Sequence, residues 1–188
     1  MYKQLVILLF NFIIRPGKTW KVCNEEQNSD NETFFKSYLY PILGIIALFS
    51  FAGILLYLKK WDVRIAIIQM IKGIIPYFAG YFVSVFTLSR LSLKLFEIKL
   101  SDSICERFTG YASAGIYVKA MLYAFFPFFT YIQLLTIYTF YIVWQGANHY
   151  LRINEKYLTK FTIFASILII IAPLIIGGLL HLTISERE

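Results

Sequence analysis

Long apolar runs alternate with short polar connections along most of the chain. Five of these runs have about 18 or more residues, the length that a helix needs to cross roughly 30 Å of hydrocarbon. They cover residues 38–58, 63–89, 104–127, 131–148 and 161–182. We therefore predict an all-α fold, that of a polytopic membrane protein with five transmembrane helices.

The apolar run nearest the N-terminus, residues 5–14, is too short to cross a bilayer. Three polar residues lie in or beside this run: Gln4, Asn11 and Arg15. Their spacing of i, i+7 and i+11 places them on one narrow face of a helix. This pattern predicts an interfacial amphipathic helix that lies on the membrane and ends at Pro16. Together with a polar linker at 24–32, it would form a cytoplasmic segment, 1–37, before a transmembrane domain, 38–188.

Residues that commonly cap helices mark several predicted starts. Asp62 and Asn154 precede the second and fifth runs, where each can accept hydrogen bonds from free backbone N–H groups. Ser103-x-x-Glu106 and Ser29-x-x-Glu32 have the spacing of a capping box before the third and first runs. We expect the second helix to continue into the cytoplasm over residues 90–98, although this stretch also alternates like a strand. Three interior prolines predict kinks: Pro41, Pro76 and Pro173.

Lysine and arginine are distributed unevenly between the two sides of this arrangement. Twelve lie on the side of the N-terminus, in residues 1–37, 90–107 and 149–160, and four lie on the opposite side. Because cytoplasmic loops carry the excess of positive charge, we predict a cytoplasmic N-terminus and an external C-terminus. Cys23 and Cys105 would then both face the cytoplasm as free thiols.

The composition favours lipid as the solvent and excludes several functional classes. Hydrophobic residues make up 59% of the chain and the mean hydropathy is +0.65, whereas soluble domains are about 45–50% apolar. The net charge of +7 comes without a dense basic stretch, so we expect no nucleic-acid partner. Motifs of hydrolases, nucleotide-binding enzymes and metalloenzymes do not occur in the sequence, so we expect a non-enzymatic protein without cofactor or metal.

Three stretches carry a family resemblance: LLFNFIIRPGKTW at 8–20, ERFTGYASAGIYV at 106–118 and IYTFYIVWQGANHYL at 137–151. They resemble the Yip family of Ypt/Rab-interacting membrane proteins, and especially its short bacterial members. The resemblance implies five spans with a cytoplasmic N-terminus and a location in the bacterial inner membrane. It also implies a role in organising membrane or recruiting a lipid or protein partner, with no catalytic residue.

Two lysines interrupt the apolar runs, Lys72 in the second and Lys119 in the third. At 1.5 Å per residue they lie about 15 Å and about 12 Å from the predicted outer ends of their helices. The spans offer no acidic partner, and two interpretations of the lysines are open. One is a polar cavity that could bind a lipid phosphate or an anionic solute. The tyrosines expected beside them are Tyr77, Tyr117 and Tyr123. The alternative is that both lysine side chains extend to the membrane edge.

This cavity gives a second functional hypothesis, a small transporter or channel subunit. Such a protein needs polar side chains that reach the cytoplasmic side. The candidates, whose helical faces do not obviously converge, are Gln69, Gln133, Gln145 and Asn148. Small residues occur at 79–80, 110–114 and 177–178. They predict close packing of helices within the bundle, and the alternative is that they form a contact between copies of the chain in a homo-oligomer.

Spin labels along residues 1–15 test the predicted interfacial helix. We expect one shallow immersion depth that varies with a helical period, because the apolar run is too short to cross the bilayer. A depth profile that passes through the bilayer centre would indicate a sixth span and an external N-terminus.

Overall fold

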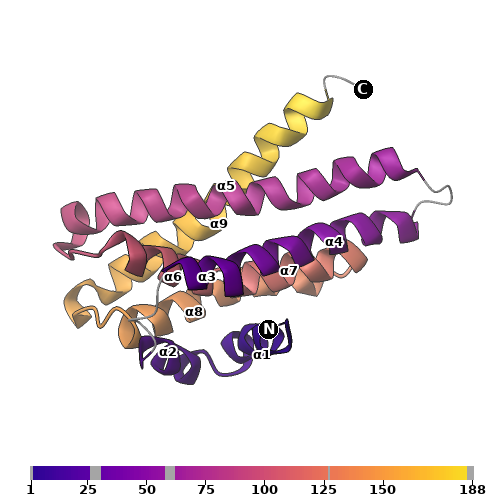
Figure 1. Ribbon diagram of the computed structural model, residues 1–188. Coiled ribbons are helices and arrows are strands. Elements are labelled where there is room, and N and C mark those ends of the chain that lie inside the picture. Colours follow the sequence, from indigo (N-terminus) through magenta and orange to yellow (C-terminus); the bar gives the residue numbers. More distant parts are fainter. Residues whose placement is uncertain (1, 26–30, 58–61, 127, 186–188) are drawn as a thin grey trace.

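The computed structural model describes residues 2–25, 31–57, 62–126 and 128–185. In this part of the chain the helices are joined by short connections, and no strand occurs. The all-α prediction is therefore confirmed. The three longest helices, α4 (Tyr40–Tyr57), α5 (Val63–Phe96) and α9 (Glu155–Ser185), run through the body of the molecule (Figure 1).

Three helical segments are long and apolar enough to cross a membrane, namely Glu32–Leu56, Val63–Phe96 and Glu155–Thr183. They correspond to the first, second and fifth predicted spans. The first segment combines α3 (Asn31–Phe34), the π-helical turn η1 (Phe35–Leu39) and α4. This wide turn comes just before Pro41, whose ring and missing N–H disfavour an ordinary α-helical turn.

The third and fourth predicted spans contain shorter helices. The third divides into α6 (Asp102–Ala112) and α7 (Ala114–Phe125), which meet at Ser113. The Ser113 hydroxyl donates to a carbonyl one turn earlier, a bond that bends helices. The fourth begins as the 3-10 turn η2 (Thr130–Gln133) and continues as α8 (Leu134–His149). By itself, each of α6, α7 and α8 is shorter than the roughly 20 residues of a typical span.

Two predicted helix starts are confirmed. The Asp62 carboxylate accepts hydrogen bonds from the N–H groups of Arg64 and Ile65, at 3.0 and 3.3 Å. Before α9, the Asn154 side chain accepts a hydrogen bond from the Lys156 N–H at 3.0 Å. Both side chains therefore satisfy backbone donors that the helix itself leaves free.

Two other predicted boundaries need correction. Ser101, not Ser103, caps α6, because its hydroxyl accepts the hydrogen bond from the Ile104 N–H at 3.3 Å. The second helix continues past residue 89 as expected, but it ends at Phe96 and not at 98. Its last turn is closed by Glu97, whose φ of 59° is left-handed. The other capping box begins at residue 29, outside the described residues.

The N-terminal segment contains two helices and not one. After α1 (Tyr2–Ile14), Pro16 begins α2 (Pro16–Glu25), at a position where the missing proline N–H costs nothing. The interpretation of Pro16 as the end of helical structure was therefore wrong. One face of α1 is buried through Leu5, Leu9 and Phe12. The predicted polar face is exposed, and it consists of Gln4, Asn11 and Arg15. The location of α1 on a membrane stays a prediction.

Trp20 holds α2 against the bundle. Its side chain is fully buried, and its Nε1–H donates to the Ile142 carbonyl at 2.9 Å. The ring lies over Gly146, where an added Cβ would be 2.7 Å away, and stacks on Phe108 with ring centroids 5.5 Å apart. These contacts join α2 to both α6 and α8.

Helices α5 and α9 run in opposite directions and meet through a reciprocal proline–glycine contact. A Cβ on Gly80 would lie 2.8 Å from the Pro173 nitrogen. Gly177 faces Pro76 less tightly, since 3.5 Å between an added Cβ and the proline Cγ is an ordinary contact. In each helix the glycine follows the proline by four residues, about one turn. The absence of a glycine side chain allows the two backbones to approach closely.

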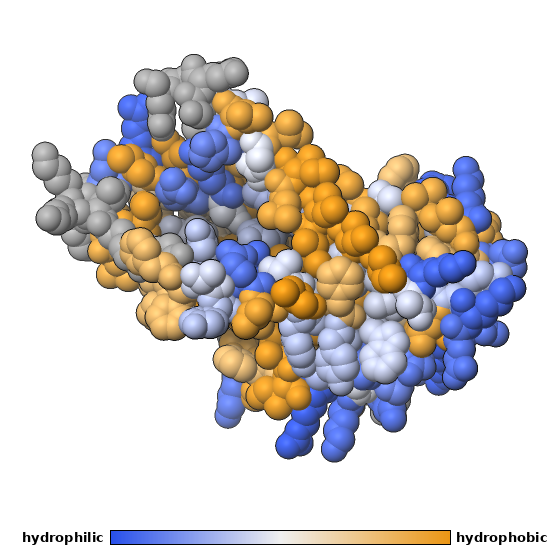
Figure 2. Space-filling model, turned by 180° about the vertical axis from the view of Figure 1, so that it is seen from behind, coloured by the Kyte–Doolittle hydropathy of each residue, from blue (hydrophilic) through white to orange (hydrophobic). Residues whose placement is uncertain are grey.

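The outer surface divides into a hydrophilic end and an apolar band. Figure 2 shows many hydrophilic side chains at one end of the molecule, others along the lower edge and toward the opposite end, and hydrophobic side chains across the middle. At the end where α5 stops and α9 begins, the exposed cationic residues include Arg90, Lys94, Lys99, Arg152, Lys156 and Lys160. A band of this kind is compatible with a lipid environment.

Gly80→Ala tests the close contact of α5 and α9. We expect it to lower the free energy of unfolding by about 1–3 kcal/mol, because the new methyl group would meet proline backbone atoms. Gly178→Ala is the matched control in α9, since no atom lies within 4 Å of its added Cβ. Thermal unfolding in detergent measures both. Equal unfolding temperatures for the two variants would contradict the contact.

Candidate functional site

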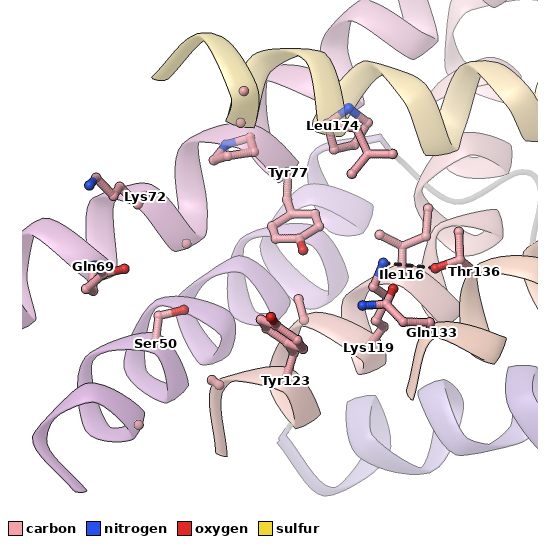
Figure 3. A pocket seen from close by; sticks show the side chains of 18 of the residues that line it. Ser50, Gln69, Lys72, Tyr77, Ile116, Lys119, Tyr123, Gln133, Thr136 and Leu174 are labelled. Atoms are coloured by element: carbon pink, nitrogen blue, oxygen red, sulfur yellow. Dashed lines mark hydrogen bonds between the residues drawn. The ribbon is translucent and has the colours of Figure 1, made fainter. Parts of the chain in front are cut away.

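A cavity of about 540 Å³ lies among α4, α5, α7, α9 and the segment formed by η2 and α8. Its volume falls within the roughly 300–1,000 Å³ of pockets that bind small molecules. The polar side chains in its wall are Ser50, Gln69, Lys72, Tyr77, Lys119, Tyr123, Gln133 and Thr136. No Asp or Glu of the described chain lines it. The cavity thus combines two cations with amides and hydroxyls inside an apolar bundle (Figure 3).

Lys119 is held in place inside the cavity. It projects from α7, is half-buried, and donates a hydrogen bond from Nζ to Thr136 Oγ1 at 2.9 Å. Gln133 lies beside it (Figure 3). An ammonium has three donors, and Thr136 accepts from one of them. The arrangement therefore presents a positioned cation and an amide side by side.

Lys72 lines the same cavity at its other end. Figure 3 shows its side chain extending away from Tyr77 and Lys119, on the side of the cavity where Gln69 lies. This direction points toward the beginning of α5, as expected for a lysine that reaches for the membrane edge. The structure therefore brings both lysines to one cavity, but it separates their ammonium groups.

The three tyrosines expected near the lysines take different positions. Tyr77 and Tyr123 line the large cavity. Tyr117 is fully buried behind it, with its ring centroid 6.4 Å from that of Tyr77. It lines a second, much smaller cavity that Tyr77 also borders. Only two of the three tyrosines can therefore contact a ligand in the large cavity directly.

Sequence reasoning missed two polar residues of the site and misjudged the placement of two others. Gln69 and Gln133 do converge on the cavity, contrary to the expectation from their helical faces, whereas Gln145 and Asn148 do not line it. Ser50 and Thr136 were not considered. The sequence did contain a pattern that could have predicted these positions. Gln69 and Lys72 are three residues apart, and so are Gln133 and Thr136. Residues at this spacing share a helix face.

Glycines form part of the cavity wall where helices come close together. A Cβ on Gly53 would lie 2.1 Å from the Ala124 carbonyl oxygen, so α4 and α7 touch through their backbones there. A Cβ on Gly73 would lie 2.2 Å from Ser50 Oγ, so α5 approaches α4 in the same region. These contacts hold α4 close to α5 and α7 at the cavity wall.

The donors that meet at the cavity suit an anion. Ammonium, amide N–H and hydroxyl groups all donate hydrogen bonds, and two positive charges have no acidic side chain beside them in the lining. A carboxylate or phosphate would supply both the missing charge and the missing acceptors. Among the described residues, no group of three or more His, Cys, Asp or Glu could hold a metal ion. Gln4, Asn11 and Arg15 of α1 do not line the cavity.

Comparisons of the chain with protein-family profiles, with curated proteins and with solved structures found no match. The resemblance to the Yip family therefore remains a prediction from the quoted stretches.

Proposed function

We propose that this chain is a five-span integral membrane protein with a cytoplasmic N-terminus and an external C-terminus. In this arrangement α6 and α7, of 11 and 12 residues, cross together as the third span. Joined at Ser113, they reach about 35 Å at 1.5 Å per residue, which is enough for the hydrocarbon core. The exposed cations where α5 stops and α9 begins support a cytoplasmic location for that end.

The function that the geometry supports best is binding of an anionic group, from a lipid headgroup or a soluble anion, in the large cavity. The observation that carries this proposal is the position of Lys119, which is hydrogen-bonded to Thr136 in a cavity without acidic lining residues. In an apolar surrounding, a positive charge without a partner is costly, and a bound anion would offset that cost. A transporter or channel subunit would use the same site to select its anion.

A non-enzymatic role in organising membrane or recruiting a protein partner, as the Yip resemblance implies, is the second candidate function. The observation that favours it is a row of exposed apolar side chains on α1. These are Val6, Ile7, Phe10 and Ile14, with exposed fractions of 43 to 67%. Such a row beside a polar face can insert into the cytoplasmic leaflet or contact a partner.

Introduced cysteines test the proposed topology. Both native cysteines are buried, so reagents would miss them from either side of the membrane. Lys99→Cys and Thr130→Cys instead place thiols at exposed positions on opposite ends of the bundle. In sealed cells, an impermeant thiol reagent applied outside should label Thr130→Cys and spare Lys99→Cys. The reverse pattern would invert the topology, and equal labelling of both would exclude five spans.

Lysine-to-methionine variants test the anion site. In nanodiscs, phosphatidylglycerol should raise the unfolding temperature relative to phosphatidylcholine, and Lys119→Met should weaken the apparent affinity about tenfold. Lys72→Met should have a smaller effect, because its side chain extends away from Lys119 and Tyr77. Lys99→Met is the control, an exposed lysine remote from the cavity.

Inorganic phosphate distinguishes the two sources of the anion. Stabilisation by phosphate alone that depends on Lys119 would assign a soluble ligand, and stabilisation by phosphatidylglycerol alone would assign a lipid headgroup. If Lys119→Met and Lys99→Met respond identically to both anions, the cavity does not bind them.

A further inference from the structure

One wall of the large cavity is apolar, and α9 provides it. The α9 residues that line the cavity are apolar or have no side chain, and they are Ile170, Pro173, Leu174, Gly177 and Gly178. At 1.5 Å per residue this wall extends about 12 Å along the helix. An extended carbon chain advances roughly 1.2 Å per bond, a third of the 3.6 Å that one extended residue spans. The wall is therefore long enough for an alkyl chain of several carbons.

The polar groups around Lys119 lie on another wall, which α7, η2 and α8 form. Lys119 is hydrogen-bonded to Thr136, and Gln133 lies beside it (Figure 3). A phosphate or carboxylate group bound here would fill only a small part of a cavity of about 540 Å³. Pockets of this size usually enclose a larger molecule and bury most of its surface. A small anion alone would therefore leave the α9 wall without a partner.

The cavity opens on the side of α9 and α7. Each lining residue on α4 and α5 is buried or half-buried, whereas the exposed lining residues come from the other elements and are Tyr123, Gln133, Leu174 and Gly178. Leu174 and Gly178 belong to the part of α9 that follows Pro173, where Ile175 and Leu179 are also exposed. In the proposed topology this part of α9 lies in the outer half of the bilayer. An apolar chain can therefore reach the opening from the hydrocarbon.

We propose that the ligand of the large cavity is an amphipathic anion, with its charged head at Lys119 and its apolar chain along the α9 wall. This inference rests on the proposed anion site and specifies what the ligand carries besides its charge. A neutral amphiphile lacks the group that would offset the charge of Lys119, and a small anion lacks the chain that would cover the wall.

A series of phosphates that differ only in chain length tests the proposal. The probes are inorganic phosphate, butyl phosphate and hexyl phosphate, added to the protein in phosphatidylcholine nanodiscs, and the rise of the unfolding temperature gives their apparent affinities. We expect hexyl phosphate to bind about tenfold more tightly than butyl phosphate, because two more methylene groups leave water. Lys119→Met should weaken the binding of both. Hexanol, which has the same chain without the charge, should give no stabilisation that depends on Lys119.

Leu174→Asn tests the position of the chain. Its matched control is Leu179→Asn, because the two leucines lie on the same part of α9 and are 60% and 59% exposed, but only Leu174 lines the cavity. The quantity compared is the ratio of the affinities for hexyl phosphate and inorganic phosphate, which cancels any general loss of stability. Leu174→Asn should lower this ratio several-fold, and Leu179→Asn should leave it unchanged.

The response to phosphatidylglycerol distinguishes two sources of the amphiphile. If Leu174→Asn weakens stabilisation by phosphatidylglycerol as well, the ligand is a membrane lipid. If it weakens only the binding of hexyl phosphate, the ligand is a soluble amphiphile.

The failure of this inference differs from the failure of the anion site. If the phosphates stabilise the protein through Lys119 but chain length has no effect, or if the two asparagine variants behave alike, the anion site stands and the amphipathic ligand is wrong. If no phosphate or phosphate ester stabilises the protein through Lys119, both proposals are wrong.

Discussion

The contact between Gly80 and Pro173 constrains the position of every other element around α5 and α9. Because Gly80 has no side chain, the ring and backbone of Pro173 lie directly against the α5 backbone. In the matching pair, Gly177 faces Pro76 at ordinary van der Waals distance. Away from this point the helices are freer to diverge. The large cavity lies to one side of the contact, and the small cavity borders Gly80 and Pro173 themselves.

The same contact explains why polar chemistry occurs in so apolar a bundle. Each proline provides the shape that fits against a glycine, and each also removes a backbone donor from its own helix. The carbonyls left without donors are those of Lys72 and Ile169, and both residues border a cavity. Close packing and local polarity therefore arise from the same residues. A bundle held together by leucine and isoleucine alone would have offered neither a gap nor an acceptor.

Some of this architecture could be predicted from the sequence because it depends on local chemistry. The caps at Asp62 and Asn154 act within one turn, so their residue types were sufficient. The break at Ser113 was missed, since a serine by itself does not end a helix and the bend comes with its hydrogen bond to the Thr109 carbonyl. The helix α2 was missed because its stability comes from Trp20 and partners more than a hundred residues later. For the site, the sequence identified both lysines that line the large cavity. It could not show that Lys72 turns away from Lys119, because side-chain direction depends on neighbouring helices.

The burial of Trp20 has a consequence for how the chain is made. The indole donates to a residue 122 positions further along, and the ring is enclosed by Gly146 of α8. During synthesis α2 leaves the ribosome before α8, yet the surface that encloses Trp20 does not exist until α8 has been translated. Until then the indole ring has no enclosing contact, and α2 is not held in its final position. A segment that is made early in this chain therefore completes its packing only after a much later one has been made.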